Sequence, residues 1–167
     1  MAIRLVILDG DGVVWDHPDL SALTPPFRRL GPDRLVDSEG RGASLTQGIR
    51  KLLKGLAERG VIIALASWNR PEPVREALQQ FGIQPYFRVV AAEPHPDKHR
   101  MIERILRRLM EEGVEVAPHQ ILYVDDRRIH LGEIRRAIGR VHFLQMHVDV
   151  KDPAEILEYV DRLADQP

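Results

Sequence analysis

The chain has 167 residues, of which 44% are hydrophobic and 29% charged, a composition typical of one globular domain with a buried core. The net charge of −1 argues against broad electrostatic binding to nucleic acid or to an anionic membrane. The absence of cysteine excludes disulfides, thiolate nucleophiles and thiolate metal sites. The N-terminus shows no signal-peptide pattern, and no apolar run approaches membrane-spanning length, so we expect a cytoplasmic protein.

The first predicted element is a strand over residues 3–8, which is apolar except for Arg4 and ends in Asp9 and Asp11. Such a run suits a strand buried on both faces of a parallel sheet. Side chains two residues apart in extended backbone point the same way, so the two carboxylates share one crevice. Because two close carboxylates repel each other unless a cation lies between them, the pair indicates an all-oxygen site for a hard ion such as Mg2+.

A Pro-rich stretch follows at about residues 15–45, and within it residues 34–41 read as a hairpin with a polar turn. We expect this stretch to be irregular otherwise. It is too short to form a separate lid domain. We therefore predict a single domain over residues 1–167 with a short insertion at about 15–45.

The rest of the chain alternates between predicted helices and strands. In chain order these are a helix from about Gln47 to Arg59 with Thr46 as N-cap and Gly60 as its end, a strand at 61–66, a helix from Pro71 to near Gly82, a strand at 88–91, a helix from about Asp97 to Glu112, a strand at 120–124, a short helix, a strand at 141–144, and a last helix from Pro153. This alternation predicts a doubly wound, Rossmann-like α/β fold with a mainly parallel five-stranded sheet and helices on both faces.

Polar residues follow several of these strands. Asp9 and Asp11 end the first, Ser67 the second, and Asp125 and Asp126 the fourth, while Lys98 begins the helix after the third. Any one of them alone is more often a helix cap, a turn former or a solvated charge. Parallel strands present their carboxyl ends at one edge of the sheet, where ligands bind. Together, the residues therefore predict a site at that edge.

This set of residues resembles the four motifs of the haloacid dehalogenase superfamily. The segment Leu8-Asp9-Gly10-Asp11-Gly12-Val13 resembles the first motif, Ala66-Ser67 the second, Lys98 the third, and Tyr123-Val124-Asp125-Asp126 the fourth. The order and spacing match, and the resemblance covers nearly the whole chain. The resemblance implies a HAD-like fold.

Within that superfamily the chain most resembles the capless magnesium-dependent phosphatases, on the basis of Trp15, Pro25-Pro26-Phe27, the segment 34–41 and Val124-Asp125-Asp126. The resemblance implies a minimal cap. Three positions depart from the pattern. Trp68 stands where Arg is usual, with Arg70 two residues further on; Arg127 and His130 stand where acidic residues are common. These departures bear on the substrate more than on the reaction.

The resemblance implies a role for each matching residue. Asp9 is the nucleophile that forms an aspartyl-phosphate, and Asp11 is the general acid and base. Ser67 and Lys98 hold the phosphoryl oxygens. Backbone N–H groups of the loop at Gly10 can add hydrogen bonds, because glycine allows close approach. Trp68 is a candidate for substrate contact by its position after the second motif. The implied cofactor is Mg2+, bound by Asp9, by the backbone carbonyl of Asp11 and by Asp126, with Asp125 as an outer partner. A shift of the motif alignment by one residue would exchange the roles of Asp125 and Asp126.

Other residues have simpler interpretations. The spacing of six histidines does not indicate a zinc site; they are His95, His99, His119, His130, His142 and His147. Arg107-Arg108, Arg127-Arg128 and Arg135-Arg136 read as solvated helix faces, although Arg127 and Arg128 adjoin the predicted site and could steer anions toward it. Trp15 and Trp68 either line the mouth of the site or pack under the Pro-rich stretch.

The expected function is therefore a Mg2+-dependent phosphomonoester hydrolase, a monomer or homodimer that binds no nucleic acid or membrane. Its open site would accept phosphotyrosine or phosphoprotein groups or sugar phosphates. The alternatives are a phosphotransferase, a relative that loads glyceryl or acyl groups onto a carrier, and a non-catalytic phospho-receiver-like module. The motif order disfavours a receiver, because a receiver's lysine follows all of its acidic residues, whereas Lys98 precedes Asp125 and Asp126.

Overall fold

The computed structural model describes residues 2–166, and its centre is a parallel five-stranded sheet in the order β7-β6-β1-β8-β9. The strands are β1 (Leu5–Leu8), β6 (Ile62–Trp68), β7 (Val89–Glu93), β8 (Ile121–Asp125) and β9 (His142–Gln145). The central position of β1 explains its apolar sequence, because a strand lies on each side of it and helices cover both of its faces.

The strands of the sheet bury alternate side chains in two separate cores. Val6 and Leu8 of β1 pack into the core on one face, whereas Leu5 and Ile7 pack into the core on the other. All four side chains are fully buried. This alternation is the period-two geometry of extended backbone applied to a strand without a solvent face.

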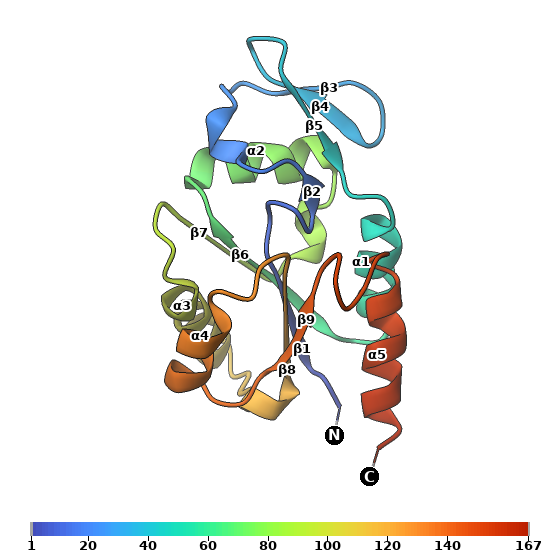
Figure 1. The fold of residues 1–167 in the computed structure, drawn as a ribbon, viewed down its shortest axis with the longest axis vertical. Coiled ribbons are helices and arrows are strands. Elements are labelled where there is room, and N and C mark those ends of the chain that lie inside the picture. The colour runs from blue at the N-terminus through green and yellow to red at the C-terminus, as the bar shows by residue number, and fades with distance from the viewer. Residues whose placement is uncertain (1, 167) are drawn as a thin grey trace.

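Five helices cover the two faces of the sheet (Figure 1). One face carries α1 (Ile49–Glu58), α2 (Pro71–Phe81) and α5 (Glu155–Ala164), and the other carries α3 (Lys98–Glu111) and α4 (Leu131–Ala137). This arrangement confirms the predicted doubly wound α/β class. Figure 1 also shows that β1 runs toward the end of the molecule that carries the small sheet.

The stretch at 15–45 is more regular than its sequence predicts. It forms a second, antiparallel sheet in the order β2-β5-β4-β3, built from β2 (Trp15–Asp16), β3 (Arg28–Arg29), β4 (Arg34–Val36) and β5 (Gly42–Leu45), with the 3-10 helix η1 (Leu20–Ala22) between β2 and β3. The hairpin predicted at 34–41 is present as β4 and β5 with a polar turn between them. The added strands β2 and β3 are only two residues long, which is below what a sequence pattern can indicate.

Helix ends follow the sequence in some places and differ in others. Pro71 begins α2, and Gly82 ends it in the left-handed conformation at φ 71°, as predicted. The prediction of Thr46 as the N-cap of α1 is wrong, because the helix begins at Ile49 after Gly48, which has a φ of 90°. A side chain at position 48 would collide with the Asp152 carboxylate, so this turn requires glycine. The last helix begins at Glu155, two residues beyond the predicted Pro153.

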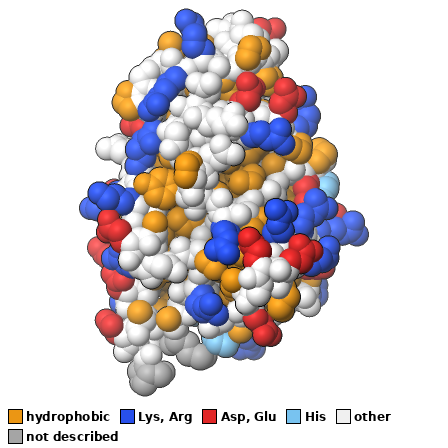
Figure 2. Space-filling model, turned by 180° about the vertical axis from the view of Figure 1, so that it is seen from behind, with side chains coloured by type: hydrophobic (Ala, Val, Ile, Leu, Met, Phe, Trp, Pro, Cys, Tyr) orange, Lys and Arg blue, Asp and Glu red, His pale blue; other side chains and the backbone are white. Residues whose placement is uncertain are grey.

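The surface carries charges of both signs. On the face opposite to that of Figure 1, Lys and Arg side chains are interspersed with Asp and Glu, and hydrophobic side chains gather near the middle (Figure 2). Among residues 2–166, no helix has the length and the apolar character needed to cross a membrane.

Candidate active site

A pocket of about 620 Å3 opens at the carboxyl edge of the central sheet, where the predicted residues were expected to meet. Asp9, Asp11, Trp68, Lys98 and Asp126 line it directly. Gly10 and Ser67 lie beneath this lining, and Ser67 has no exposed surface. The pocket therefore brings together residues separated by more than 100 positions in the chain.

Asp9 and Lys98 form a buried ion pair on the floor of the pocket. The Lys98 Nζ donates to Asp9 Oδ1 at 2.6 Å and to the Ala66 carbonyl at 2.7 Å, and the lysine is only 2% exposed. Burial raises the pKa of the Asp9 carboxyl well above its usual value, and the Lys98 ammonium opposes that rise. A buried carboxylate with one strong cationic partner is poised to act as a nucleophile or as a metal ligand.

Asp125 and Asp126 complete a group of three carboxylates with Asp9, with one oxygen of each residue within 4.8 Å of the others. Both oxygens of the Asp125 carboxylate already accept hydrogen bonds, one from the Tyr123 hydroxyl and one from the Arg127 N–H at 3.0 Å. Asp126 instead lines the pocket. Its carboxylate lies so close to Gly12 that a side chain there would collide with it, which explains why glycine stands at position 12.

The two aspartates differ in their affinity for protons. Burial alone would raise the pKa of Asp125, but the Lys98 ammonium and the Tyr123 hydroxyl outweigh it, so that pKa is lowered. Burial, followed by the neighbouring Asp125, raises the pKa of Asp126. Of these two aspartates, Asp125 therefore loses its proton more readily, and Asp126 gains more from a cation in the pocket.

Asp11 lies at the side of the pocket and accepts three hydrogen bonds. Trp15 Nε1 donates to its Oδ1 at 2.7 Å and the Leu20 N–H does so at 3.1 Å, while Asn69 Nδ2 donates to its Oδ2 at 3.1 Å. Burial raises the pKa of Asp11, and these hydrogen bonds act against it. A carboxyl held in one orientation with a raised pKa suits general acid and base chemistry near neutral pH.

The two tryptophans lie in different places, so packing inside the fold applies to one of them and lining the mouth of the site applies to the other. Trp15 is completely buried below the pocket and contacts Asp11 through its indole N–H. Trp68 is 44% exposed and lines the pocket. Trp15 therefore packs inside the fold, and Trp68 is at the mouth.

The sequence analysis missed Asn69, although a signal for it was available. Residues two apart in extended backbone face the same way, which places Asn69 beside Ser67 after β6. Asn69 is 2% exposed, and its Nδ2 donates to Ser67 Oγ at 2.8 Å as well as to Asp11. At the base of this group, a side chain at Gly10 would collide with Trp15 and approach Ser67 Oγ within 2.9 Å.

Arg127 and His130 occupy the loop after β8. Arg127 is exposed and lines the pocket, whereas Arg128 stacks over the Phe143 ring at 5.2 Å. His130 is 7% exposed, and burial lowers its pKa, which favours the neutral ring. His130 is the departure noted in the sequence, a histidine at a position where acidic residues are common by the resemblance.

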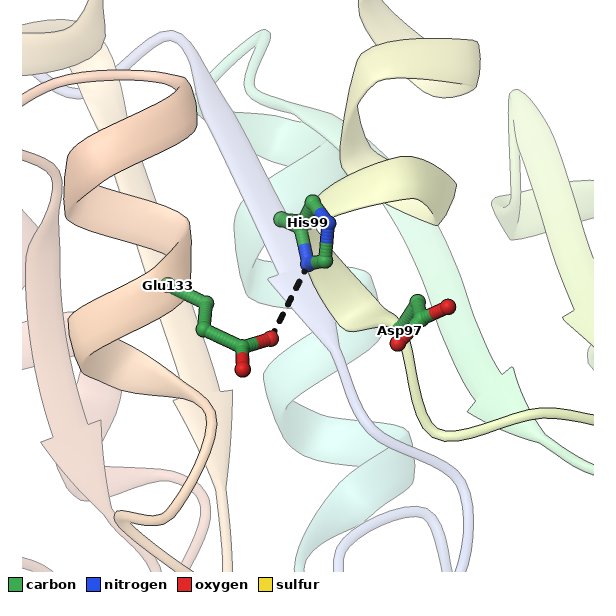
Figure 3. A group of neighbouring side chains, drawn as sticks. All are labelled: Asp97, His99 and Glu133. Atoms are coloured by element: carbon green, nitrogen blue, oxygen red, sulfur yellow. Dashed lines mark ion pairs between the residues drawn. The ribbon is translucent and has the colours of Figure 1, made fainter.

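A second group of possible metal ligands lies outside the pocket, formed by Asp97, His99 and Glu133 (Figure 3). His99 Nδ1 lies 3.3 Å from Glu133 Oε2, which joins α3 to α4. Sequence spacing did not indicate this group, because Glu133 comes from α4, whereas Asp97 and His99 lie at the start of α3. Arg100 and Arg136 line the same shallow hollow, and their positive charges oppose cation binding.

Comparison with solved structures supports the fold. The N-terminal part of a Bacteroides fragilis protein, which contains a phosphatase domain and was solved in complex with Mg, aligns over 97% of this chain with 20% identity and a TM-score of 0.63. This chain covers only 40% of that one. A HAD-superfamily hydrolase of subfamily IA from Geobacter sulfurreducens aligns over 95% of this chain and all of its own length, with 21% identity and a TM-score of 0.65.

A further relative is 3-deoxy-D-manno-octulosonate 8-phosphate phosphatase from Moraxella catarrhalis, solved with magnesium, phosphate and KDO. It aligns over 96% of this chain and 86% of its own, with 15% identity and a TM-score of 0.57. At these identities the likeness establishes the fold alone. No curated protein sequence matches the chain.

The family model described as haloacid dehalogenase-like hydrolase matches residues 34–132, more than half of the chain. The matched region includes Ser67, Lys98, Asp125 and Asp126. Asp9 and Asp11 precede it, so their place in the site rests on geometry, because both line the same pocket as Lys98 and Asp126. With this match and this fold, the chain belongs to the haloacid dehalogenase-like hydrolase family.

Proposed function

We propose that this protein is a Mg2+-dependent phosphomonoester hydrolase of the capless magnesium-dependent type, with Asp9 as the nucleophile. The observation that carries the proposal is the buried pair of Asp9 and Lys98, 2.6 Å apart, on the floor of a pocket that also presents Asp11 and Asp126. A nucleophilic carboxylate, a cation and a second carboxyl for proton transfer are the groups that phosphoryl transfer through an aspartyl-phosphate requires.

The carboxylates fit a hard divalent cation. Asp9, Asp125 and Asp126 place oxygens within 4.8 Å of one another, with the Lys98 ammonium as their close cation. Such a group of carboxylate oxygens suits Mg2+. We assign the ion to Asp9, Asp126 and the backbone carbonyl of Asp11, because Asp125 is engaged by Tyr123 and Arg127. When bound, Mg2+ would offset the charge repulsion between the phosphate and the nucleophile.

The residues of the pocket then divide the reaction between them. Asp9 attacks phosphorus, the bond from phosphorus to the leaving oxygen breaks, and Asp11 donates its proton to that oxygen. In the second step Asp11 takes a proton from water, the water oxygen attacks the phosphorus of the aspartyl-phosphate, the bond between phosphorus and the Asp9 oxygen breaks, and inorganic phosphate leaves. Lys98, Ser67 and the backbone at Gly10 hold the phosphoryl oxygens through both steps. Gly12 cannot assist, because its N–H donates to the Trp15 carbonyl at 2.9 Å.

The pocket favours a substrate larger than phosphate itself. Its volume of about 620 Å3 and its mouth at Trp68, Arg70 and Arg127 suit a sugar phosphate or a phosphorylated side chain. The Moraxella relative, solved with KDO and phosphate, makes a sugar phosphate the first substrate to examine. We further propose that residues 1–167 act as a single catalytic domain in which the segment at about 15–45 is an insertion rather than a separate cap.

The proposal is tested with p-nitrophenyl phosphate and Mg2+. We expect release of inorganic phosphate by the wild type. Asp9→Asn should reduce turnover below a few per cent, because the shape is kept but the nucleophile is lost. Asp165→Asn, the same change at an exposed position outside the pocket, is the matched control and should leave turnover unchanged. Retention of substantial activity by a correctly folded Asp9→Asn protein would rule out Asp9 as the nucleophile.

A further inference from the structure

We infer that Asn69 is a positioning residue for the phosphatase reaction, one that orients both the proton-transfer carboxyl of Asp11 and the phosphate-binding hydroxyl of Ser67. This inference rests on the proposed function and extends it to a residue outside the four motifs. Asn69 is 2% exposed and lines the pocket beside both side chains. Its role follows from the direction in which each of its hydrogen bonds runs.

The orientation of the Asn69 amide is determined by its neighbour Ser21. The Ser21 backbone N–H lies 3.0 Å from Asn69 Oδ1, and since a backbone N–H can only donate, the atom facing it must be the amide oxygen. The Ser21 hydroxyl also lies 2.6 Å from the same oxygen. That hydroxyl accepts the Arg70 N–H at 3.0 Å, so its own proton is directed to Asn69.

With its oxygen held in this way, Asn69 must present its NH2 group to the catalytic side chains. One contact runs to Asp11 Oδ2 at 3.1 Å and the other to Ser67 Oγ at 2.8 Å. The amide thus has both of its N–H bonds and its oxygen engaged, in a site where an unpaired polar group would be costly. A fully satisfied amide of this kind has one preferred orientation.

Each of the two donated bonds has a separate consequence. Because Asn69 holds Asp11 Oδ2 while Trp15 and Leu20 hold Oδ1, the carboxyl plane is fixed against rotation. Because the Ser67 oxygen accepts from Asn69, the hydroxyl proton of Ser67 is not directed at Asn69, which leaves it for the phosphoryl oxygen that the proposed function assigns to Ser67. Asn69 therefore serves proton transfer and phosphate binding together.

The same network joins the small sheet region to the catalytic edge. Besides the contacts to Asn69, the Arg70 Nη2 donates to the Ser21 carbonyl at 2.9 Å. Ser21 belongs to η1, which precedes β3, whereas Asn69 and Arg70 follow β6. The orientation of Asn69 is thus set by a loop that also lines the pocket.

The test compares Asn69→Ala with the wild type on two aryl phosphates of similar shape. Phenyl phosphate needs protonation of its leaving oxygen much more than p-nitrophenyl phosphate does. If Asn69 positions Asp11, kcat/KM should fall about 100-fold for phenyl phosphate but only about 10-fold or less for p-nitrophenyl phosphate. If it also orients Ser67, inhibition by inorganic phosphate should weaken about fivefold. Gln79→Ala, the same truncation on the exposed side of α2, should change none of these values.

The outcomes separate the possible failures. Equal losses on the two substrates, or no loss, would overturn the positioning role while leaving the proposed function standing. A wild type inactive on both substrates would overturn the proposed function and this inference with it. If Asn69→Ala does not fold, as judged by circular dichroism, Ser21→Ala keeps Asn69 but removes one donor to its oxygen. That variant should also lose more kcat/KM on phenyl phosphate than on p-nitrophenyl phosphate, but to a smaller degree. If its kcat/KM falls by the same factor on both substrates, or on neither, the inference is again overturned.

Discussion

Replacing Lys98 by Met should destabilise the protein strongly in the absence of divalent ions, with a pH dependence of known sign. Lys98→Met keeps most of the side-chain volume but removes the ammonium. In the wild type that ammonium lies 2.6 Å from Asp9 Oδ1 and 3.9 Å from Asp125 Oδ2. The variant is left with Asp9, Asp125 and Asp126 together in a largely buried site.

The magnitude follows from the geometry of the pair. At 2.6 Å, with an effective dielectric constant of about 20, the attraction between Lys98 and Asp9 is roughly 6 kcal/mol before desolvation is subtracted. Removing one partner of a buried pair typically costs about 3–5 kcal/mol, because the remaining charge is left uncompensated. We expect a loss in this range at neutral pH, together with the loss of catalytic turnover.

The pH dependence has a definite direction. Burial raises the pKa of Asp9 and Lys98 opposes that rise, so the variant in its folded state holds the Asp9 proton more tightly than the wild type does. A carboxyl whose folded pKa is raised contributes stability at low pH that is lost as pH increases through that pKa. The loss of stability in the variant relative to the wild type should therefore grow as the pH rises above about 4, the ordinary pKa of an aspartate.

Denaturant unfolding in EDTA, followed by circular dichroism at several pH values, measures this difference. Lys54→Met on the exposed face of α1 is the matched control and should unfold with the wild type. Added Mg2+ should recover more stability in Lys98→Met than in the control, because it restores positive charge to the acidic group. Equal unfolding midpoints for Lys98→Met and wild type at pH 7 in EDTA would refute the electrostatic reasoning.

Two further predictions concern the metal and the small sheet. Chelation should abolish turnover of p-nitrophenyl phosphate, and added Mg2+ should restore it. Ca2+ should restore it poorly, because its higher coordination number would misplace the attacking oxygen. Full activity in EDTA would contradict this prediction. In the turn between β4 and β5, burial acts to raise the pKa of Asp37, but hydrogen bonds from the Thr24, Arg41 and Glu39 N–H groups outweigh it and lower that pKa. Stability from Asp37 should therefore be present at neutral pH and lost as pH falls below about 4. Asp37→Asn should lower the melting temperature at pH 7 and reduce its fall on acidification, and an unchanged slope would argue against this role.

Much of the fold was predictable because its signals are local. The run over residues 3–8 is apolar at five of its six positions, which indicates burial on both faces, and the central place of β1 in the sheet accounts for it. Pro71 and Gly82 restrict or permit particular backbone angles, and they mark the ends of α2 as expected. Thr46 was predicted as the N-cap of α1 because threonine favours that position. The helix instead begins after Gly48, where the close approach of Asp152 leaves no room for a side chain.

The strand order and the partners inside the site depended on contacts in space that a sequence pattern does not specify, whether the residues are near or far along the chain. The pairing of β2 with β5 brings together segments too short to carry a periodic pattern. The division of roles between Asp125 and Asp126 depends on the Tyr123 hydroxyl and the Arg127 N–H, which hold only the first of the two. The same holds for Trp15, because the sequence pattern did not reveal its contact with Asp11.

The sequence by itself determined the α/β class and the candidate residues Asp9, Asp11, Ser67, Lys98 and Asp126, because strand alternation and polar strand ends are properties of neighbouring positions. Only the tertiary structure decided how these groups are held. The direction of the Asn69 amide comes from Ser21, 48 positions away, and the charge balance at Asp9 comes from Lys98, 89 positions away. Hydrogen-bond direction and buried charge depend on distances through space, which separation along the chain does not specify.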